Sequence, residues 1–314
     1  MMQKNRYLFS VKAAAIVLMA GSAPTISLAD ETANSIVPDA QMRSRIITIG
    51  GPVTETVHAL GLEERIVAVD TTSVYPINLL KDKPNVGYMR ALSAEGVLSL
   101  TPSMILAIDG AGPAEVVKVL QSASVPLKSI PTARSEEGVV GKIRLIANIM
   151  GVPEKGETLI ASVQKDFSSL SELTSTLAKR KRVMFVLSVR SGKIVASGRN
   201  TAAAGMIALA GAENALSEFE GYKPLSDEAL INAAPDVILM MNRGGHEGGP
   251  EDVLALPTVS ATPAGQSRSI LKIDGAYLLG FGPRTAGAAL ELAHRLYPSL
   301  AKSRKGLPAS ERVN

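Results

Sequence analysis

Residues 95–106, Glu-Gly-Val-Leu-Ser-Leu-Thr-Pro-Ser-Met-Ile-Leu, and residues 228–239, Glu-Ala-Leu-Ile-Asn-Ala-Ala-Pro-Asp-Val-Ile-Leu, decide the fold because they repeat one pattern. In each stretch a glutamate is followed seven residues later by a proline and then by an apolar run. The proline breaks a helix, and the apolar run indicates a buried strand. The offset between the two copies is 133 residues, which predicts two lobes built on one α/β pattern.

Apolar runs rich in β-branched residues alternate with helical stretches on both sides of this repeat. The expected strands are residues 45–49, 65–69, 104–108, 182–187 and 237–241. The expected helices are residues 54–60, capped by Thr54, then 201–209 and 285–296. The strand at Arg182 follows the strand at Arg45 by 137 residues, nearly the offset of the repeat. This alternation is typical of parallel α/β sheets.

Residues 154–180 contain no proline and a single glycine, and their large apolar residues recur at helical spacing. We expect one helix of about 25 residues, about 38 Å long at about 1.5 Å per residue. As segment 151–181 it joins an N-terminal α/β lobe, residues 30–150, to a C-terminal α/β lobe, residues 182–314. A stiff connection leaves a cleft between two lobes, and such clefts are preferred places for small ligands.

The first 29 residues are typical of a secretory signal. Three basic residues precede an apolar run, Ala13 to Ala20, and Ser27-Leu28-Ala29 has the small residues of a cleavage site. The run is shorter than the roughly 20 apolar residues that span a bilayer, although an uncleaved anchor is the alternative. Cleavage after Ala29 lowers the formal charge from +4 to +1. We therefore expect an exported, periplasmic protein that does not bind nucleic acid.

The composition excludes several kinds of site. The chain has no cysteine, which rules out disulfides, thiolate metal sites and a cysteine nucleophile. Its three histidines are His58, His246 and His294. The first and last fall in predicted helices and are expected to be ordinary helix residues, whereas His246 lies in a glycine-rich loop after a strand. G-x-S-x-G, P-loop and H-E-x-x-H motifs are absent, so no enzyme class is indicated.

Tyr75 stands in the loop after the expected strand 65–69. Ligands of α/β proteins bind at the carboxyl ends of strands, and Pro76 keeps the preceding residue extended. From position alone, projection into a site and packing on its own turn remain equally open for Tyr75.

Three segments carry a resemblance to one family. Residues 70–76 (Asp-Thr-Thr-Ser-Val-Tyr-Pro), residues 86–96 (Val-Gly-Tyr-Met-Arg-Ala-Leu-Ser-Ala-Glu-Gly) and Gly282-Pro283-Arg284 resemble the periplasmic haemin-binding proteins of bacterial haem-uptake ABC transporters. The Gly-Pro-Arg element is shared with siderophore and cobalamin carriers, whereas the two tyrosine-containing segments are the specific part. The resemblance covers residues 45–298. It implies two Rossmann-like α/β lobes joined by a single long helix, the class III periplasmic binding protein fold.

The resemblance implies that Tyr75 is the axial ligand of ferric haem iron. A phenolate is a hard anionic donor and an established haem ligand. Further candidates are side chains suited to apolar walls, to the propionates or to a second axial ligand or second haem: Met240, Met241, Arg90, Arg243 and His246. Arg243 is also a candidate partner of the phenolate. Arg284 is expected to hold the loop before the last helix.

Glu95 and Glu228 occupy equivalent positions of the repeat, one in each lobe. The resemblance implies that such a pair docks onto arginines of an inner-membrane ABC permease, which works with its ATPase. Charge complementarity of this kind sets orientation and encounter rate more than affinity. The alternative is that both glutamates merely favour the dipole of their helix.

The leading interpretation is a monomeric carrier that binds haem without chemistry. A carrier of a ferric siderophore or a corrinoid is the first alternative, and an exported haem-using or haem-degrading enzyme is the second. The enzyme alternative requires acid–base groups, and no such cluster is apparent near Tyr75 in the sequence.

Overall fold

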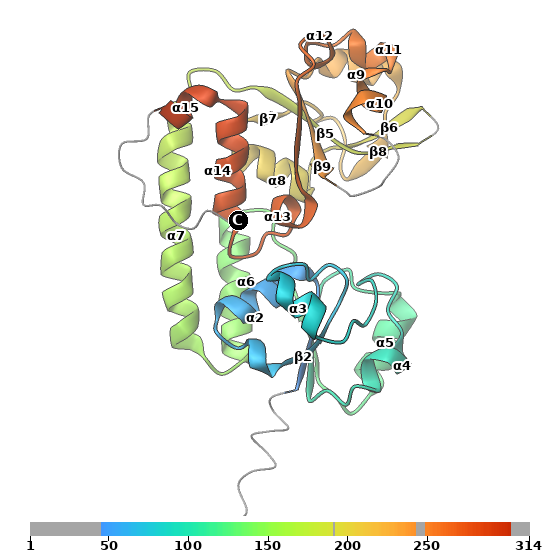
Figure 1. Ribbon diagram of the computed structural model, residues 1–314, viewed down its shortest axis with the longest axis vertical. Helices are drawn as coiled ribbons and strands as arrows, with labels where there is room; N and C mark the ends of the chain where they lie inside the picture. Colours follow the sequence, from blue (N-terminus) through green and yellow to red (C-terminus); the bar gives the residue numbers. More distant parts are fainter. Residues whose placement is uncertain (1–44, 191, 243–248, 303–314) are drawn as a thin grey trace, which may run out of the picture. The chain divides into compact units, whose positions relative to one another are not determined.

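The computed structural model describes residues 45–190, 192–242 and 249–302, all within one compact unit, residues 39–314. The expected signal segment, Arg243 and His246 lie outside the described residues. Figure 1 shows two sheets with their helices and a long helix beside them. The predicted α/β class with two lobes is confirmed.

The described part of the N-terminal sheet has four parallel strands in the order β2-β1-β3-β4. Its strands are β1 (Ile46–Ile49), β2 (Ile66–Val69), β3 (Met104–Ile108) and β4 (Leu127–Ile130). Its helices are α2 (Gly51–Ala59), η1 (Glu63–Arg65), α3 (Ile77–Asp82), α4 (Ala94–Leu98), α5 (Ala114–Ser122) and α6 (Glu136–Ile149). Neighbouring residues of β1 belong to different core clusters, Ile46 to one and Ile47 to the other. The sheet is therefore covered on both faces, as parallel sheets are.

Among the residues that the structure describes, the C-terminal sheet has six strands and is mixed. The strands are β5 (Arg182–Arg190), β6 (Lys193–Ser197), β7 (Glu213–Asn214), β8 (Tyr222–Pro224), β9 (Val237–Asn242) and β10 (Ile270–Asp274). β10, β9, β5 and β7 pair in parallel, whereas β6 and β8 add an antiparallel edge. The helices are α8 (Ala202–Leu209), α9 (Asp227–Ala233), α10 (Pro250–Leu254), α11 (Pro257–Ser260), α12 (Pro263–Gln266), α13 (Gly275–Leu279), α14 (Thr285–Leu296) and α15 (Pro298–Lys302).

The repeat predicted from the sequence is confirmed in three dimensions. Helix α4 leads into β3, which pairs in parallel with β1, and helix α9 leads into β9, which pairs in parallel with β5. Each helix begins after a serine cap: the side chain of Ser93 accepts a hydrogen bond from the N–H of Gly96, and that of Ser226 from the N–H of Ala229. Equivalent caps place the two glutamates of the repeat in equivalent first turns.

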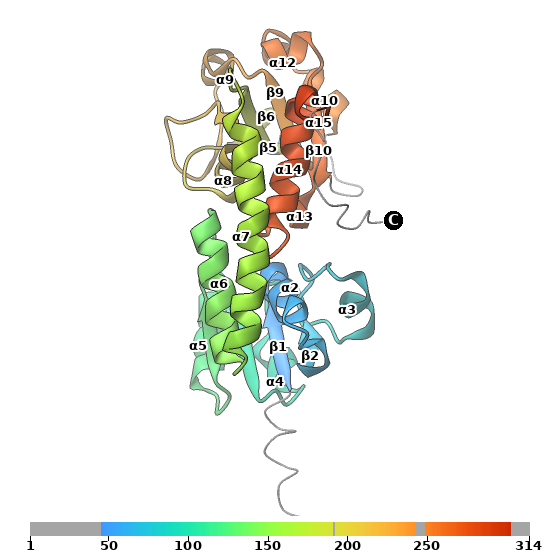
Figure 2. The same ribbon diagram turned by 90° about the vertical axis from the view of Figure 1, so that its left-hand side faces the viewer.

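The long helix is α7 (Pro153–Ser175), of 23 residues, about 35 Å at about 1.5 Å per residue. It packs along α6 and α14, as both views show (Figures 1 and 2). It ends five residues before the predicted Arg180, because the hydroxyls of Thr174, Ser175 and Thr176 donate to carbonyls of the preceding turn. None of the described helices, α7 included, has both the length and the apolar character needed to cross a membrane.

The predicted start of the first helix was wrong. Helix α2 begins at Gly51, three residues before the expected cap Thr54, because Pro52 suits the first helical turn. Thr54 is buried instead, and its hydroxyl bonds to the hydroxyls of Thr48 and Ser73, each at 2.7 Å. Gly50 has φ of +104°, and a Cβ there would lie 2.5 Å from the Cγ2 of Ile108. The glycine therefore permits this close turn.

Two glycines in packed helices give a matched stability test. A Cβ at Gly156 of α7 would lie 2.4 Å from the Cβ of Ala147 on α6, whereas one at the exposed Gly141 meets no described atom within 4 Å. We expect Gly141→Ala to raise the free energy of unfolding by up to about 1 kcal/mol through helix propensity. Gly156→Ala should lower it by about 1–3 kcal/mol through overpacking. Denaturant unfolding measures both, and equal stabilisation would contradict the close packing of α6 on α7.

Candidate functional site

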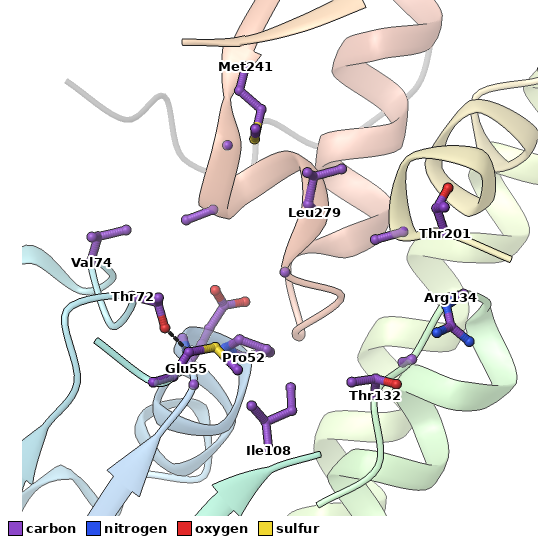
Figure 3. Close-up of a pocket in the computed structure, with 18 of the residues that line it drawn as sticks. Pro52, Glu55, Thr72, Val74, Ile108, Thr132, Arg134, Thr201, Met241 and Leu279 are labelled. Carbon is purple, nitrogen blue, oxygen red and sulfur yellow. Dashed lines mark hydrogen bonds between the residues drawn. The ribbon is translucent and has the colours of Figure 1, made fainter. Parts of the chain in front are cut away.

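A cavity of about 760 Å³ lies between residues of both lobes. This volume is typical of small-molecule sites, which range over about 300–1,000 Å³. Figure 3 shows Pro52 and Ile108 of the N-terminal lobe on one side and Met241 and Leu279 of the C-terminal lobe on the other. The cavity therefore has apolar walls contributed by both lobes.

Tyr75 lines this cavity and is half-buried. Its loop is organised by the buried carboxylate of Asp70, which accepts hydrogen bonds from the N–H of Gly50 and the hydroxyl of Ser73, and from the N–H and hydroxyl of Thr72. Thr72 in turn accepts from the N–H of Gly51 at 2.9 Å, the dashed line in Figure 3. The Asp-Thr-Thr-Ser stretch thus ties the tyrosine loop to the start of α2, which fixes where Tyr75 lies.

Arg284 lies against Tyr75, which the sequence did not reveal. Its Cζ is 3.5 Å from the centroid of the Tyr75 ring and 5.0 Å from that of Tyr277. Glu55, on α2, is 8% exposed, and its carboxylate accepts from the Arg284 backbone N–H at 3.0 Å and from its Nη2 at 2.8 Å. The expectation that Arg284 holds the loop before the last helix therefore accounts for some of its contacts but not for its contact with Tyr75.

Lys142 of α6 completes this charged group. The residue is only 2% exposed, and its Nζ donates to the carbonyl of Phe281 at 3.0 Å. Burial lowers the pKa of Lys142 to about 8, and the nearby negative charge of Glu55 opposes that shift. The expectation that no acid–base cluster lies near Tyr75 was therefore wrong. The three charged residues of this group are far apart in the sequence, so no local motif predicts that Glu55, Lys142 and Arg284 lie together.

The Gly-Pro-Arg element has a steric explanation. A Cβ at Gly282 would lie 2.8 Å from Oε1 of Glu55, so the glycine lets this backbone approach the carboxylate without displacing it. The N–H two residues later, on Arg284, then reaches the same oxygen.

Two cations line other parts of the cavity. Arg90, a predicted candidate, lines the cavity and is exposed. Arg134 also lines the cavity and is exposed, but it was not among the predicted candidates. Burial raises the pKa of the Tyr222 phenol, whereas its hydrogen bonds with Ala203 and Thr201 and the positive charges of Arg134 and Arg90 oppose that shift. Arg134 follows β4 as Tyr75 follows β2, and this position after a strand was the available signal.

The two methionines that were predicted as wall residues differ in where they lie. Met241 lines the cavity, but Met240 does not: it is 6% exposed and packs in the core of the C-terminal lobe. Consecutive residues of a strand point to opposite faces, so only one of the two could line the site.

His58 is half-buried, pairs with Glu63 and lies edge-on to Tyr75 at 6.2 Å between ring centroids. Among the described residues, no group of three His, Cys, Asp or Glu could hold a metal ion.

Glu95 and Glu228 are both exposed, and each is the second residue of its helix. Figure 1 shows α4 in the N-terminal lobe and α9 in the C-terminal lobe. Neither glutamate lines the cavity, so neither is part of the site described above.

Comparison with known proteins identifies the family. A family model of periplasmic binding proteins matches residues 46–277. The chain belongs to the periplasmic binding protein family. Members of this family bind and carry substrates for transport, so the expectation of a binding protein rather than an enzyme is confirmed.

Three known proteins illustrate what this binding protein resembles. The structure of the periplasmic heme-binding protein BhuT in complex with two hemes matches with a TM-score of 0.77 and 40% identity, covering 82% of this chain and 98% of that one. The uncharacterized ABC transporter substrate-binding lipoprotein YvrC of Bacillus subtilis is 26% identical over 276 residues, 87% of this chain and 86% of the relative. A vitamin B12-binding protein of Pectobacterium atrosepticum is 23% identical over 266 residues, 82% of this chain and 92% of the relative.

The lowered pKa of Lys142 predicts how the stability of the binding protein depends on pH. Because the pKa of this lysine is lowered to about 8 in the folded state, the unfolded chain binds more protons between about pH 8 and the ordinary lysine pKa of 10.5. This residue therefore makes the free energy of unfolding rise with pH in that window. Lys142→Met should remove that rise, as measured by denaturant unfolding at pH 7, 8, 9 and 10. The exposed Lys165→Met is the control, and a Lys142→Met profile parallel to wild type would contradict the lowered pKa.

Proposed function

We propose that this protein binds ferric haem in the cavity between its lobes, with Tyr75 as the axial ligand of the iron. The observation that carries the proposal is the phenol of Tyr75 lining a 760 Å³ cavity while the Arg284 guanidinium covers its ring at 3.5 Å. The guanidinium packed on the ring makes a cation–π contact that restrains the side chain at the cavity wall, and tyrosine is an established ligand of haem iron.

The rest of the cavity suits the other parts of haem. Apolar side chains from both lobes, such as Ile108 and Leu279, offer walls for a porphyrin, and Met241 adds a polarisable contact. Arg90 and Arg134 are cations within reach of the cavity for two propionates. Arg243 and His246 stay predictions for further contacts. A carrier needs few iron ligands, because it must release what it holds.

The similarity to a haem-binding protein at 40% identity supports haem over a corrinoid. The similarity to a vitamin B12-binding protein, at 23% identity, keeps the corrinoid as the second candidate. A corrinoid needs no phenolate ligand on ferric iron, so the two ligands make different demands on Tyr75. Binding of cyanocobalamin without binding of haemin would decide for the corrinoid.

Haemin titration of Tyr75→Phe tests the ligand. We expect wild type to give a high-spin ferric spectrum with a phenolate-to-iron charge-transfer band. Tyr75→Phe keeps the ring beneath Arg284 but lacks the oxygen, so it should lose the band and bind haemin at least about tenfold more weakly, about 1.4 kcal/mol. Tyr88→Phe removes another phenol that lines the cavity and should keep the band. A band lost in Tyr88→Phe and kept in Tyr75→Phe would overturn the assignment.

We further propose that the protein is exported by its signal segment, residues 1–29, and works as a monomer. Its lobes, residues 30–150 and 182–314, are joined by segment 151–181. It delivers haem to an inner-membrane ABC permease and its ATPase. The exposed Glu95 and Glu228, one in each lobe and in equivalent first turns, are suited to dock on cationic side chains of the permease.

Reversing both charges tests the docking. Glu95→Lys with Glu228→Lys should reduce haem uptake by cells at least about tenfold while the affinity for haemin stays unchanged, because neither residue lines the cavity. Two measurements separate these effects. Uptake by cells is measured with haem as the sole iron source, and the affinity is measured by haemin titration of the purified variant. The control reverses Glu64 and Glu218, which are also exposed, one in each lobe. Equal uptake by the two double variants would refute docking through the repeat.

A further inference from the structure

We propose that Gly205 of α8 is a positioning residue: it lets the C-terminal lobe hold Arg134 of the N-terminal lobe where its guanidinium binds a carboxylate of the ligand. The inference rests on the proposed function, because haem carries two carboxylates. It deepens that function by naming what the cavity recognises besides the iron. The contact between the lobes then contributes directly to the choice of ligand.

Arg134 stands in the short loop between β4 and α6, and the residues on both sides of it are anchored. Ala133 is 6% exposed and belongs to a core cluster that also contains Ala203 of α8. Ser135 is the cap of α6, and its side chain accepts a hydrogen bond from a backbone N–H of the first turn at 3.3 Å. The position at which the Arg134 side chain leaves the backbone is therefore well defined.

Helix α8 approaches the backbone of Arg134 itself. A Cβ at Gly205 would lie 2.2 Å from the carbonyl oxygen of Arg134 and 3.1 Å from Cζ of Phe281. A backbone carbonyl cannot turn aside as the end of a flexible side chain can, so a larger residue at position 205 would displace the Arg134 loop. The two lobes are therefore in close contact at Arg134 because Gly205 has no side chain.

The side chain of Arg134, in contrast, is exposed and lines the cavity. Figure 3 shows it on the same side of the cavity as Thr201, with Val74 on the opposite side. Burial raises the pKa of the Tyr222 phenol, and the positive charges of Arg134 and Arg90 oppose that rise, so both cations act on one part of the cavity wall. Neither guanidinium forms an ion pair with any residue that the structure describes. Their N–H donors are thus available to a ligand.

The chemistry of this part of the wall suits a carboxylate. A guanidinium is a planar fork that donates two parallel hydrogen bonds to one carboxylate, and such bonds are roughly twice as strong as neutral ones. A binding group must be held within about 0.5 Å of the productive position by the residues that support it. The contact of Gly205 with the Arg134 backbone provides this support from the opposite lobe.

Haemin and its dimethyl ester test the inference, because the ester keeps the iron and the porphyrin but lacks both negative charges. We expect the wild-type protein to bind haemin at least about tenfold more tightly than the ester. Arg134→Met should weaken binding of haemin by about tenfold and leave binding of the ester unchanged. Gly205→Ala should have the same selective effect, because its methyl group displaces the Arg134 backbone. The double variant should match Arg134→Met alone, since Gly205 acts through Arg134.

Two variants on α6 are matched controls. Gly141→Ala adds a methyl group that meets no described atom within 4 Å, and Arg144→Met removes an exposed cation that does not line the cavity. Both should keep the preference for haemin over the ester. Ser135→Ala loosens the Arg134 loop at its other end, so it should also lower the preference, and it serves if Gly205→Ala does not fold.

Each outcome decides one claim. A wild-type protein that binds neither haemin nor the ester defeats the proposed function itself. Equal affinity of the wild type for both, or a full preference for haemin in Arg134→Met, would overturn the carboxylate subsite and leave the proposed haem binding standing. A preference lost in Arg134→Met but kept in both Gly205→Ala and Ser135→Ala would overturn the positioning role. Equal loss of both ligands in Gly205→Ala would mean general damage to the cavity, which also contradicts positioning of Arg134.

Discussion

The arrangement of the site depends on one buried carboxylate that reaches from one lobe to the other. Glu55 accepts two hydrogen bonds from Arg284, and the guanidinium so held covers the ring of Tyr75. The Gly-Pro-Arg backbone can approach because Gly282 has no side chain. A buried ion pair contributes little net stability, but removing one partner leaves an uncompensated charge. The contact is therefore better understood as fixing a geometry than as adding stability.

Around this contact the fold combines a rigid frame with an open site. Helix α7 runs without interruption beside α6 and α14, and Gly156 brings it close to α6. The cavity is lined by strand ends and by the loops and helices that follow them, which is where α/β proteins bind ligands. Stiff packing on one side and an open site on the other suit the proposed binding of a flat ligand by one iron bond and several weak contacts.

The sequence predicted those features that depend on local pattern. Strand β3 and helix α14 match their predicted bounds, and the repeat predicted the paired α4–β3 and α9–β9 units, because periodicity, prolines and serine caps act over a few residues. The start of α2 was missed because Pro52 favours a helical first turn, whereas Thr54 was taken as its cap. The contacts of Glu55, Lys142 and Arg284 could not be predicted, since they join residues more than 130 positions apart. Met240 and Met241 could have been separated by strand alternation alone.

Resonance Raman spectroscopy of the ferric haem complex tests the central claim most directly, since it reports the atom bonded to the iron. With excitation into the charge-transfer band, we expect phenolate ring vibrations that shift when the tyrosine rings are deuterated and that vanish in Tyr75→Phe. A haem complex without these vibrations, or one that keeps them in Tyr75→Phe, would contradict ligation by Tyr75 and with it the proposed site.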